Sequence, residues 1–109
     1  MKMSGIPFQT TTWSDVEPTE HKGDSGIATW RTKRFGDVRV RLVEYSAGYA
    51  ADHWCTKGHV LLCLEGSLET ELKDGRRFTL RPGDSYQVAD EAEAHRSATA
   101  TGAKLFIVD

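Results

Sequence analysis

The amino-acid sequence predicts a small all-β domain. Short segments alternate apolar with polar residues, turn residues separate them about every ten residues, and no segment shows a convincing helical period. About eight or nine such segments favour a β-barrel or β-sandwich. A chain of 109 residues is long enough for one domain around one core.

The first two segments predict a β-hairpin. Residues 27–35 alternate around Trp30, and a Gly-Asp pair then turns the chain. In residues 38–45, valine and leucine alternate with Arg39 and Arg41. Because alternate side chains of a strand lie on opposite faces, we expect the two arginines on the outer, solvated face.

The remaining strands are predicted at 51–55, 59–64, 67–72, 76–80, 85–89, 95–99 and 104–108. Asp74-Gly75 predicts a two-residue type I′ turn, in which both central residues have positive φ. In residues 67–72 the alternation predicts that Glu69 and Glu71 face outward. Residues 89–94 contain good helix formers but form too short a segment, so we expect a loop or a single turn there.

Residues 1–26 show little periodicity and predict an N-terminal arm, followed by a barrel domain over 27–109. The arm carries three apolar anchors, Ile6, Phe8 and Trp13. Since the edge strands of a sheet need cover, we expect this arm to pack on the barrel or on a partner subunit.

Composition excludes several classes of function. A formal net charge of −2 argues against a general nucleic-acid binder. No stretch approaches the roughly 20 apolar residues of a membrane span, and the N-terminus lacks the apolar core of a signal peptide. We therefore expect a cytoplasmic protein, in which Cys55 and Cys63 are free thiols or metal ligands and not a disulfide.

Three potential metal ligands lie within seven residues, namely His53, Cys55 and His59, and His95 follows alone. On a strand, His53 and Cys55 would point the same way, while His59 opens the next apolar segment. Imidazole and thiolate together suit zinc, iron, nickel or copper. The pattern indicates a metal site if these residues meet in space.

The same residues carry a resemblance to small single-domain cupins, which have the double-stranded β-helix fold. The first cupin motif is similar to the segment that contains Gly48, His53-Trp54-Cys55, His59 and Gly66; the second is similar to Pro82-Gly83-Asp84 followed by His95. The likeness covers about residues 36–108. Cys55 stands where the motif has its second histidine, and His59 stands where it has glutamate. The Asp-His-Trp-Cys run most resembles a small bacterial group of cupin-fold proteins labelled by a DHCW motif.

The resemblance implies a jelly-roll-like barrel and a homodimer. It also implies one divalent transition-metal ion (Zn, Fe or Ni) held by His53, Cys55, His59 and His95, and a small-molecule ligand or substrate. It implies no particular reaction, because cupins host dioxygenases, isomerases, lyases and non-enzymatic binders on one scaffold. A metal-dependent enzyme, a non-catalytic binding or sensing module and a structural zinc site are the three hypotheses.

Each ligand assignment has an alternative. His53 could be a hydrogen-bonded core residue, Cys55 an inert buried thiol, and His59 a hydrogen-bond donor behind a ligand or a base in the pocket. Four protein ligands would close a tetrahedral zinc site, whereas iron or nickel would keep open positions. Two further residues, Cys63 and Tyr86, are the candidate pocket residues.

Overall fold

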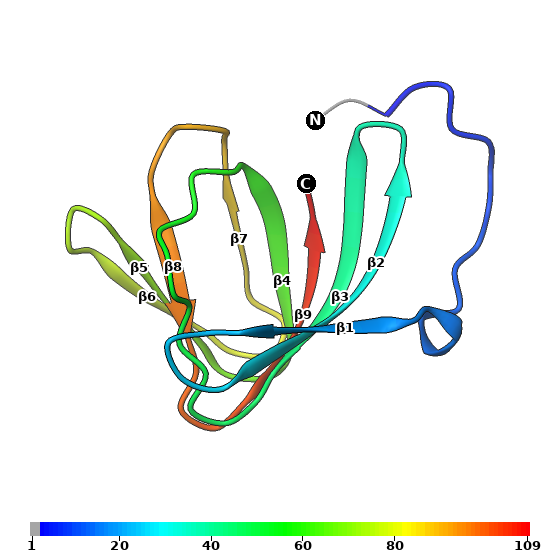
Figure 1. The fold of residues 1–109 in the computed structure, drawn as a ribbon. Helices are drawn as coiled ribbons and strands as arrows, with labels where there is room; N and C mark the ends of the chain where they lie inside the picture. Colours follow the sequence, from blue (N-terminus) through cyan, green and yellow to red (C-terminus); the bar gives the residue numbers. More distant parts are fainter. Residues whose placement is uncertain (1–2) are drawn as a thin grey trace.

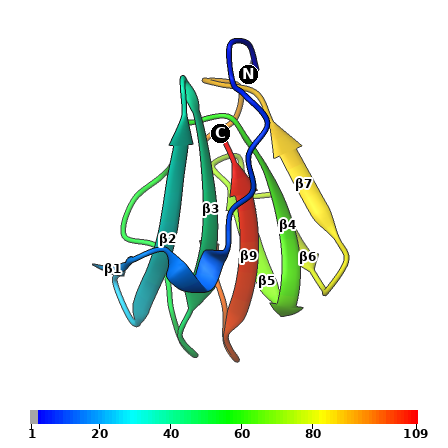
Figure 2. The ribbon, with the colours of Figure 1, turned by 90° about the vertical axis from the view of Figure 1, so that its right-hand side faces the viewer.

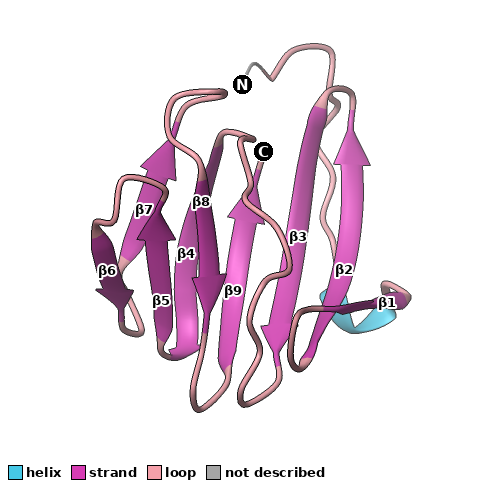
Figure 3. Cartoon of the chain, turned by 60° about the vertical axis from the view of Figure 1, so that its left-hand side comes forward, coloured by secondary structure: helices cyan, strands magenta, loops and turns pink. Residues whose placement is uncertain are grey.

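A computed structural model describes residues 3–109 and shows two antiparallel β-sheets that face each other (Figures 1 and 3). Across the larger sheet the order is β1 (Pro18–Lys22), β2 (Ile27–Phe35), β3 (Val38–Tyr45), β9 (Ala103–Val108), β4 (His59–Gly66) and β7 (Ser85–Val88). The smaller sheet has the order β6 (Arg77–Leu80), β5 (Leu68–Leu72) and β8 (His95–Ala98). The predicted all-β class is confirmed.

The core lies between the two sheets. Its fully buried leucines are Leu61 on β4 and Leu105 on β9 from the larger sheet, and Leu68 on β5 from the smaller one. Burial of each such side chain contributes about 1.5–3 kcal/mol, so these contacts hold the sheets together. Cys63 belongs to the same cluster and is fully buried.

The N-terminal segment is tied to the larger sheet. A 3-10 helix, η1 (Trp13–Asp15), precedes β1, and β1 pairs with β2 as the edge of the sheet. Trp13 packs edge-to-face against Phe106, with ring centroids 6.2 Å apart. Figure 2 shows the segment running along the outer side of the sheet beside β9. Residues 1–2 of the predicted arm lie outside the described residues.

Most predicted strands agree with the structure to within two residues at each end, but the predicted strand over 51–55 is wrong. The segment between β3 and β4 is a loop that touches the smaller sheet only at isolated bridges, Ala50 to Ala98 and Cys55 to His95. The rule that alternate residues of a strand share a face therefore does not apply to His53 and Cys55.

The prediction of a type I′ turn at Asp74-Gly75 is also wrong. Gly75 has a φ of 100°, whereas Asp74 is not among the described residues with positive φ. Instead, the Asp74 carboxylate accepts a hydrogen bond from the Arg76 backbone N–H at 3.1 Å, which stabilises a different turn. Residues 89–94 form a turn, as predicted. In the part of the chain that the structure describes, no helix is long and apolar enough to cross a membrane.

Candidate functional site

Two histidines from opposite sheets meet at one end of the barrel. His59 is the first residue of β4 and His95 is the first residue of β8. Their Nε2 atoms lie 3.1 Å apart, and both residues are more than nine-tenths buried. Because the two strands start at the same end of the barrel, residues 36 positions apart in the sequence form one site.

The surroundings of the two Nδ1 atoms determine whether each Nε2 atom donates or accepts a hydrogen bond. His95 Nδ1 lies 2.9 Å from the Glu93 carbonyl oxygen, so Nδ1–H donates and Nε2 carries a lone pair. His59 Nδ1 is buried, has no hydrogen-bond partner and lies 3.7 Å from Asp109 Oδ2. A proton on this Nδ1 leaves a second lone pair on His59 Nε2. The Tyr86 hydroxyl, 2.9 Å away, can donate to it.

Cys55 is joined to His95 by two backbone hydrogen bonds. The Cys55 N–H donates to the His95 carbonyl at 2.7 Å, and the His95 N–H donates back at 3.0 Å. The neighbouring imidazole lowers the pKa of the Cys55 thiol, and the thiol raises the pKa of His95. The backbone bridge therefore holds Cys55 next to His95.

His53 does not join this group. It lies on the loop before Cys55, its side chain is 74% exposed, and its Nδ1 contacts Asp52 Oδ1 at 2.6 Å. A metal role for His53 stays a prediction that requires the loop to move.

A buried ion cluster lies behind His59. Arg39 binds the Asp109 carboxylate with two nitrogens at 2.9 Å each, and Arg41 Nη2 reaches Oδ2 at 3.1 Å. Arg41 also lies over the Trp30 ring, with its guanidinium carbon 4.4 Å from the ring centroid. The expectation that Arg39 and Arg41 face solvent is wrong, because both pair with the buried Asp109 carboxylate and Arg41 is only 6% exposed.

The charges of this cluster fix the ionisation of Asp109. Burial alone would raise its pKa, but the hydrogen bonds from Arg39 and the charges of Arg41 and Arg39 hold the pKa well below its usual range. The sequence analysis missed Asp109. Its position continues the inward-facing series Leu105 and Ile107 on β9, and that parity could have revealed it.

The two candidate pocket residues have different surroundings. Tyr86 contacts His59, and burial raises the pKa of its phenol. Together with His95 it lines a slot of about 180 Å³ between β7 and the smaller sheet. Cys63 packs in the core, where its thiol contacts the Glu65 carbonyl oxygen at 3.6 Å and burial raises its pKa.

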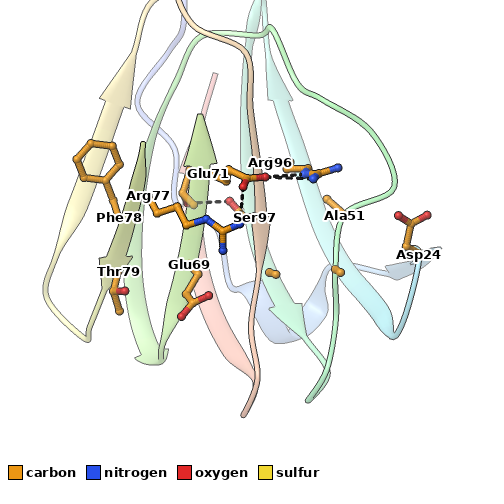
Figure 4. A pocket seen from close by; sticks show the side chains of 12 residues that line it. Asp24, Ala51, Glu69, Glu71, Arg77, Phe78, Thr79, Arg96 and Ser97 are labelled. Carbon is orange, nitrogen blue, oxygen red and sulfur yellow. Dashed lines mark hydrogen bonds and ion pairs between the residues drawn. The ribbon is translucent and has the colours of Figure 1, made fainter. Parts of the chain in front are cut away.

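A second hollow lies on the outer side of the smaller sheet (Figure 4). It has a volume of about 380 Å³ and includes Glu71, whose carboxylate forms an ion pair with Arg77 at 2.7 Å and accepts a hydrogen bond from Arg96 at 3.1 Å. None of the four predicted metal ligands lines it. The outward orientation predicted for Glu69 and Glu71 agrees with this position.

The donor set fits a metal ion in part. Among the described residues, no group of three or more His, Cys, Asp and Glu side chains is assembled to hold one. The two Nε2 atoms, however, face each other at the separation expected of two ligands of one ion. Cys55, whose backbone is bridged to His95, is the nearest candidate for a third ligand among the residues predicted from the sequence.

Comparison with known proteins identifies the fold. No family model and no curated protein matches the chain. It is similar to a predicted oxalate decarboxylase from Thermotoga maritima, with 13% identity, a TM-score of 0.78 and 92% of this chain covering 96% of that one. The ectoine synthase from P. lautus has 17% identity and a TM-score of 0.72, covering 93% of this chain and 76% of its own.

A cupin-2 domain-containing protein from Shewanella frigidimarina has 21% identity and a TM-score of 0.60, covering 73% of this chain and 78% of its own. These identities are low, so the likeness concerns the fold. The chain has a cupin fold, as the sequence resemblance implied.

Proposed function

We propose that this cupin binds one divalent transition-metal ion through His59, His95 and Cys55, beside a site for a small molecule. The observation that carries the proposal is the 3.1 Å separation of the two Nε2 atoms. With the Nδ1 proton of His95 committed to the Glu93 carbonyl, its Nε2 presents a lone pair to His59. A shared cation would relieve the repulsion between two such lone pairs.

The surrounding residues support this ligand set. The Glu93 carbonyl orients the His95 ring, and the Asp109 carboxylate lies behind His59 and is itself held by two arginines. Metal-binding histidines commonly have such a carbonyl or carboxylate on their second nitrogen. Imidazole nitrogen with thiolate sulfur suits zinc, iron or nickel. A reducing compartment such as the cytoplasm would keep both cysteines as the free thiols seen here.

A bound ion would supply Lewis-acid catalysis or an activated water. The chain itself supplies the Tyr86 hydroxyl, 2.9 Å from His59 Nε2, to donate a hydrogen bond to a ligand oxygen. The similar structures include proteins titled ectoine synthase and predicted oxalate decarboxylase, which favours a small molecule as the partner. A dioxygenase, isomerase or lyase reaction is compatible with this site.

A metal-free binding or sensing module is the second candidate. It is favoured by the hydrogen bonds that already reach both histidines, between Tyr86 and His59 and between His95 and the Glu93 carbonyl oxygen. In this case the site would bind its ligand by hydrogen bonds alone and retain its affinity after treatment with a chelator.

Elemental analysis of the untagged protein tests the metal proposal. We expect about one equivalent of metal in the wild type and in the matched control His21→Ala, which removes a histidine on β1 that is not a predicted ligand. The variants His95→Ala and His95→Gln should lose it, the second with less change in core volume. Circular dichroism would show that each variant is folded. A folded wild type that holds no metal after growth and reconstitution with Zn, Fe or Ni would overturn the proposal.

We also propose that the protein is a homodimer formed through the outer face of its larger sheet. Val60 and Leu64 on β4 are 44% and 38% exposed, and between them Leu62 lies opposite Phe106 on β9. Phe8 on the arm is 95% exposed. Such a contiguous apolar face is typical of a protein–protein interface, and a second copy can cover it symmetrically.

A further inference from the structure

The slot that Tyr86 and His95 line has a size and a chemical lining that indicate which class of ligand it binds. It opens between β7 and the smaller sheet, and His95 and Tyr86 lie in its lining. Its volume is about 180 Å³. A dry protein cavity of about 150 Å³ binds benzene, so this slot has room for one six-membered ring with a small substituent.

The walls of the slot are mainly apolar. Leu72 comes from β5, Phe78 from β6 and Val88 from β7. Phe78 is 49% exposed although it lies in this lining, so an aromatic face is available at the entrance. Aromatic and aliphatic walls on opposite sides favour a flat apolar ring over a sugar or another polyhydroxy compound.

The charged groups at the rim carry no excess of positive charge. Arg76 Nη2 lies 2.5 Å from Glu93 Oε1 and 2.9 Å from Asp74 Oδ2. The guanidinium is therefore already paired with two carboxylates, and the rim carries no surplus positive charge for an anionic ligand. This arrangement disfavours a carboxylate and favours a neutral molecule.

The polar groups in the lining can hold one oxygen atom. The Thr70 hydroxyl is engaged with the Ser97 hydroxyl at 2.8 Å. The Tyr86 hydroxyl can donate to His59 Nε2, which leaves its oxygen as an acceptor, and His95 Nε2 is a second acceptor. A hydroxyl on the ligand could donate a hydrogen bond to either acceptor, whereas a hydrocarbon could not.

We infer that the slot binds a neutral, single-ring aromatic molecule with a hydroxyl group. The ring lies between Phe78 and Val88, and the hydroxyl points to Tyr86 and His95. This inference rests on the proposal that the His59–His95 pair is the functional site, and it names the class of ligand that the pair receives.

Titration of the full chain with phenol, followed by NMR amide shifts, tests the inference. We expect saturable shifts at slot residues, and weaker binding of benzoate and of glucose. Phe78→Ser should weaken phenol binding by about tenfold, because it removes one aromatic wall. The matched control is Ile27→Ser, which removes an exposed apolar side chain from β2 of the larger sheet.

Three results would overturn the inference: benzoate or glucose binding as tightly as phenol, an equal effect of the two variants, or shifts confined to residues outside the slot. Repeating the titration on metal-free and metal-loaded protein separates this inference from the metal proposal. Phenol binding that depends on Phe78 in a protein that takes up no metal would support the slot and reject the ion. Metal uptake without phenol binding would support the metal site and reject the phenol slot.

Discussion

Asp109 links the charged interior of the barrel to the histidine pair. Its carboxylate is fully buried, accepts hydrogen bonds from Arg39 and Arg41, and lies 3.7 Å from His59 Nδ1. Removal of one partner from a buried ion pair costs about 3–5 kcal/mol, because the other charge is left without compensation. His59, at the start of β4, thus lies beside a buried carboxylate that directly follows β9.

Asp109→Asn should lower the free energy of unfolding of the metal-free protein by about 3 kcal/mol at neutral pH. The pKa of Asp109 is lower in the folded than in the unfolded state, so its contribution is present above the unfolded value of about 3.9 and is lost on further acidification. The stability difference between wild type and variant should therefore shrink below about pH 4.

Urea denaturation between pH 3 and pH 7 measures this difference. Asp74→Asn is the control, because Asp74 forms an exposed ion pair with Arg76 and should have a smaller effect. A constant difference between wild type and Asp109→Asn across the whole pH range would contradict the assignment.

At the scale of elements, the corner between β4 and β5 carries the chain from one sheet to the other. Gly66 ends β4 with a φ of 75°. A Cβ atom there would lie 2.0 Å from the Gly102 carbonyl oxygen, which is a backbone atom and cannot rotate away. The corner therefore requires glycine for both its conformation and its space.

Gly66→Ala should destabilise the fold by about 3 kcal/mol or more, because the strain of a positive φ adds to a backbone clash. Gly83→Ala is the matched control. Gly83 also has a positive φ, 96°, but a Cβ there would meet open space, so we expect a loss of about 1–2 kcal/mol. Equal losses in chemical denaturation would show that the Gly102 contact is unimportant.

The strands also show which features of the fold can be predicted from sequence patterns. Alternation and a glycine turn predicted β2 and β3, because each strand has a neighbour in the same hairpin. Alternation does not say which face is buried, so Arg41 was predicted outside although Asp109 and Trp30 hold it inside. The segment over 51–55 has strand-like residues but only isolated bridges, because strand formation depends on a partner that the sequence does not specify.

At the scale of the whole molecule, two sheets bring β4 and β8 together at one end of the barrel. The approach of His59 and His95 could be expected from the cupin resemblance but not from spacing alone, because it depends on how the sheets face each other. Cys55 reaches the same end through its backbone bridge to His95. The loop position of His53 could not be predicted, because the alternation rule applies only within a strand.

The exposed apolar face predicts the assembly state. Phe8→Asp should convert the proposed homodimer into a monomer in sedimentation-velocity experiments, because a charge would be buried at the interface. The effect on the stability of the isolated subunit should be small, since Phe8 is 95% exposed. A wild type that is monomeric at high concentration, or a dimer unaffected by the substitution, would contradict the proposed interface.

The central claim is that His59, His95 and Cys55 hold one metal ion, and X-ray absorption spectroscopy of the metal-loaded protein tests it most directly. We predict imidazole nitrogen neighbours together with one sulfur neighbour, and loss of the sulfur in Cys55→Ser. A spectrum without imidazole neighbours would contradict the histidine pair. A spectrum with imidazole but no sulfur in the wild type would contradict the role of Cys55.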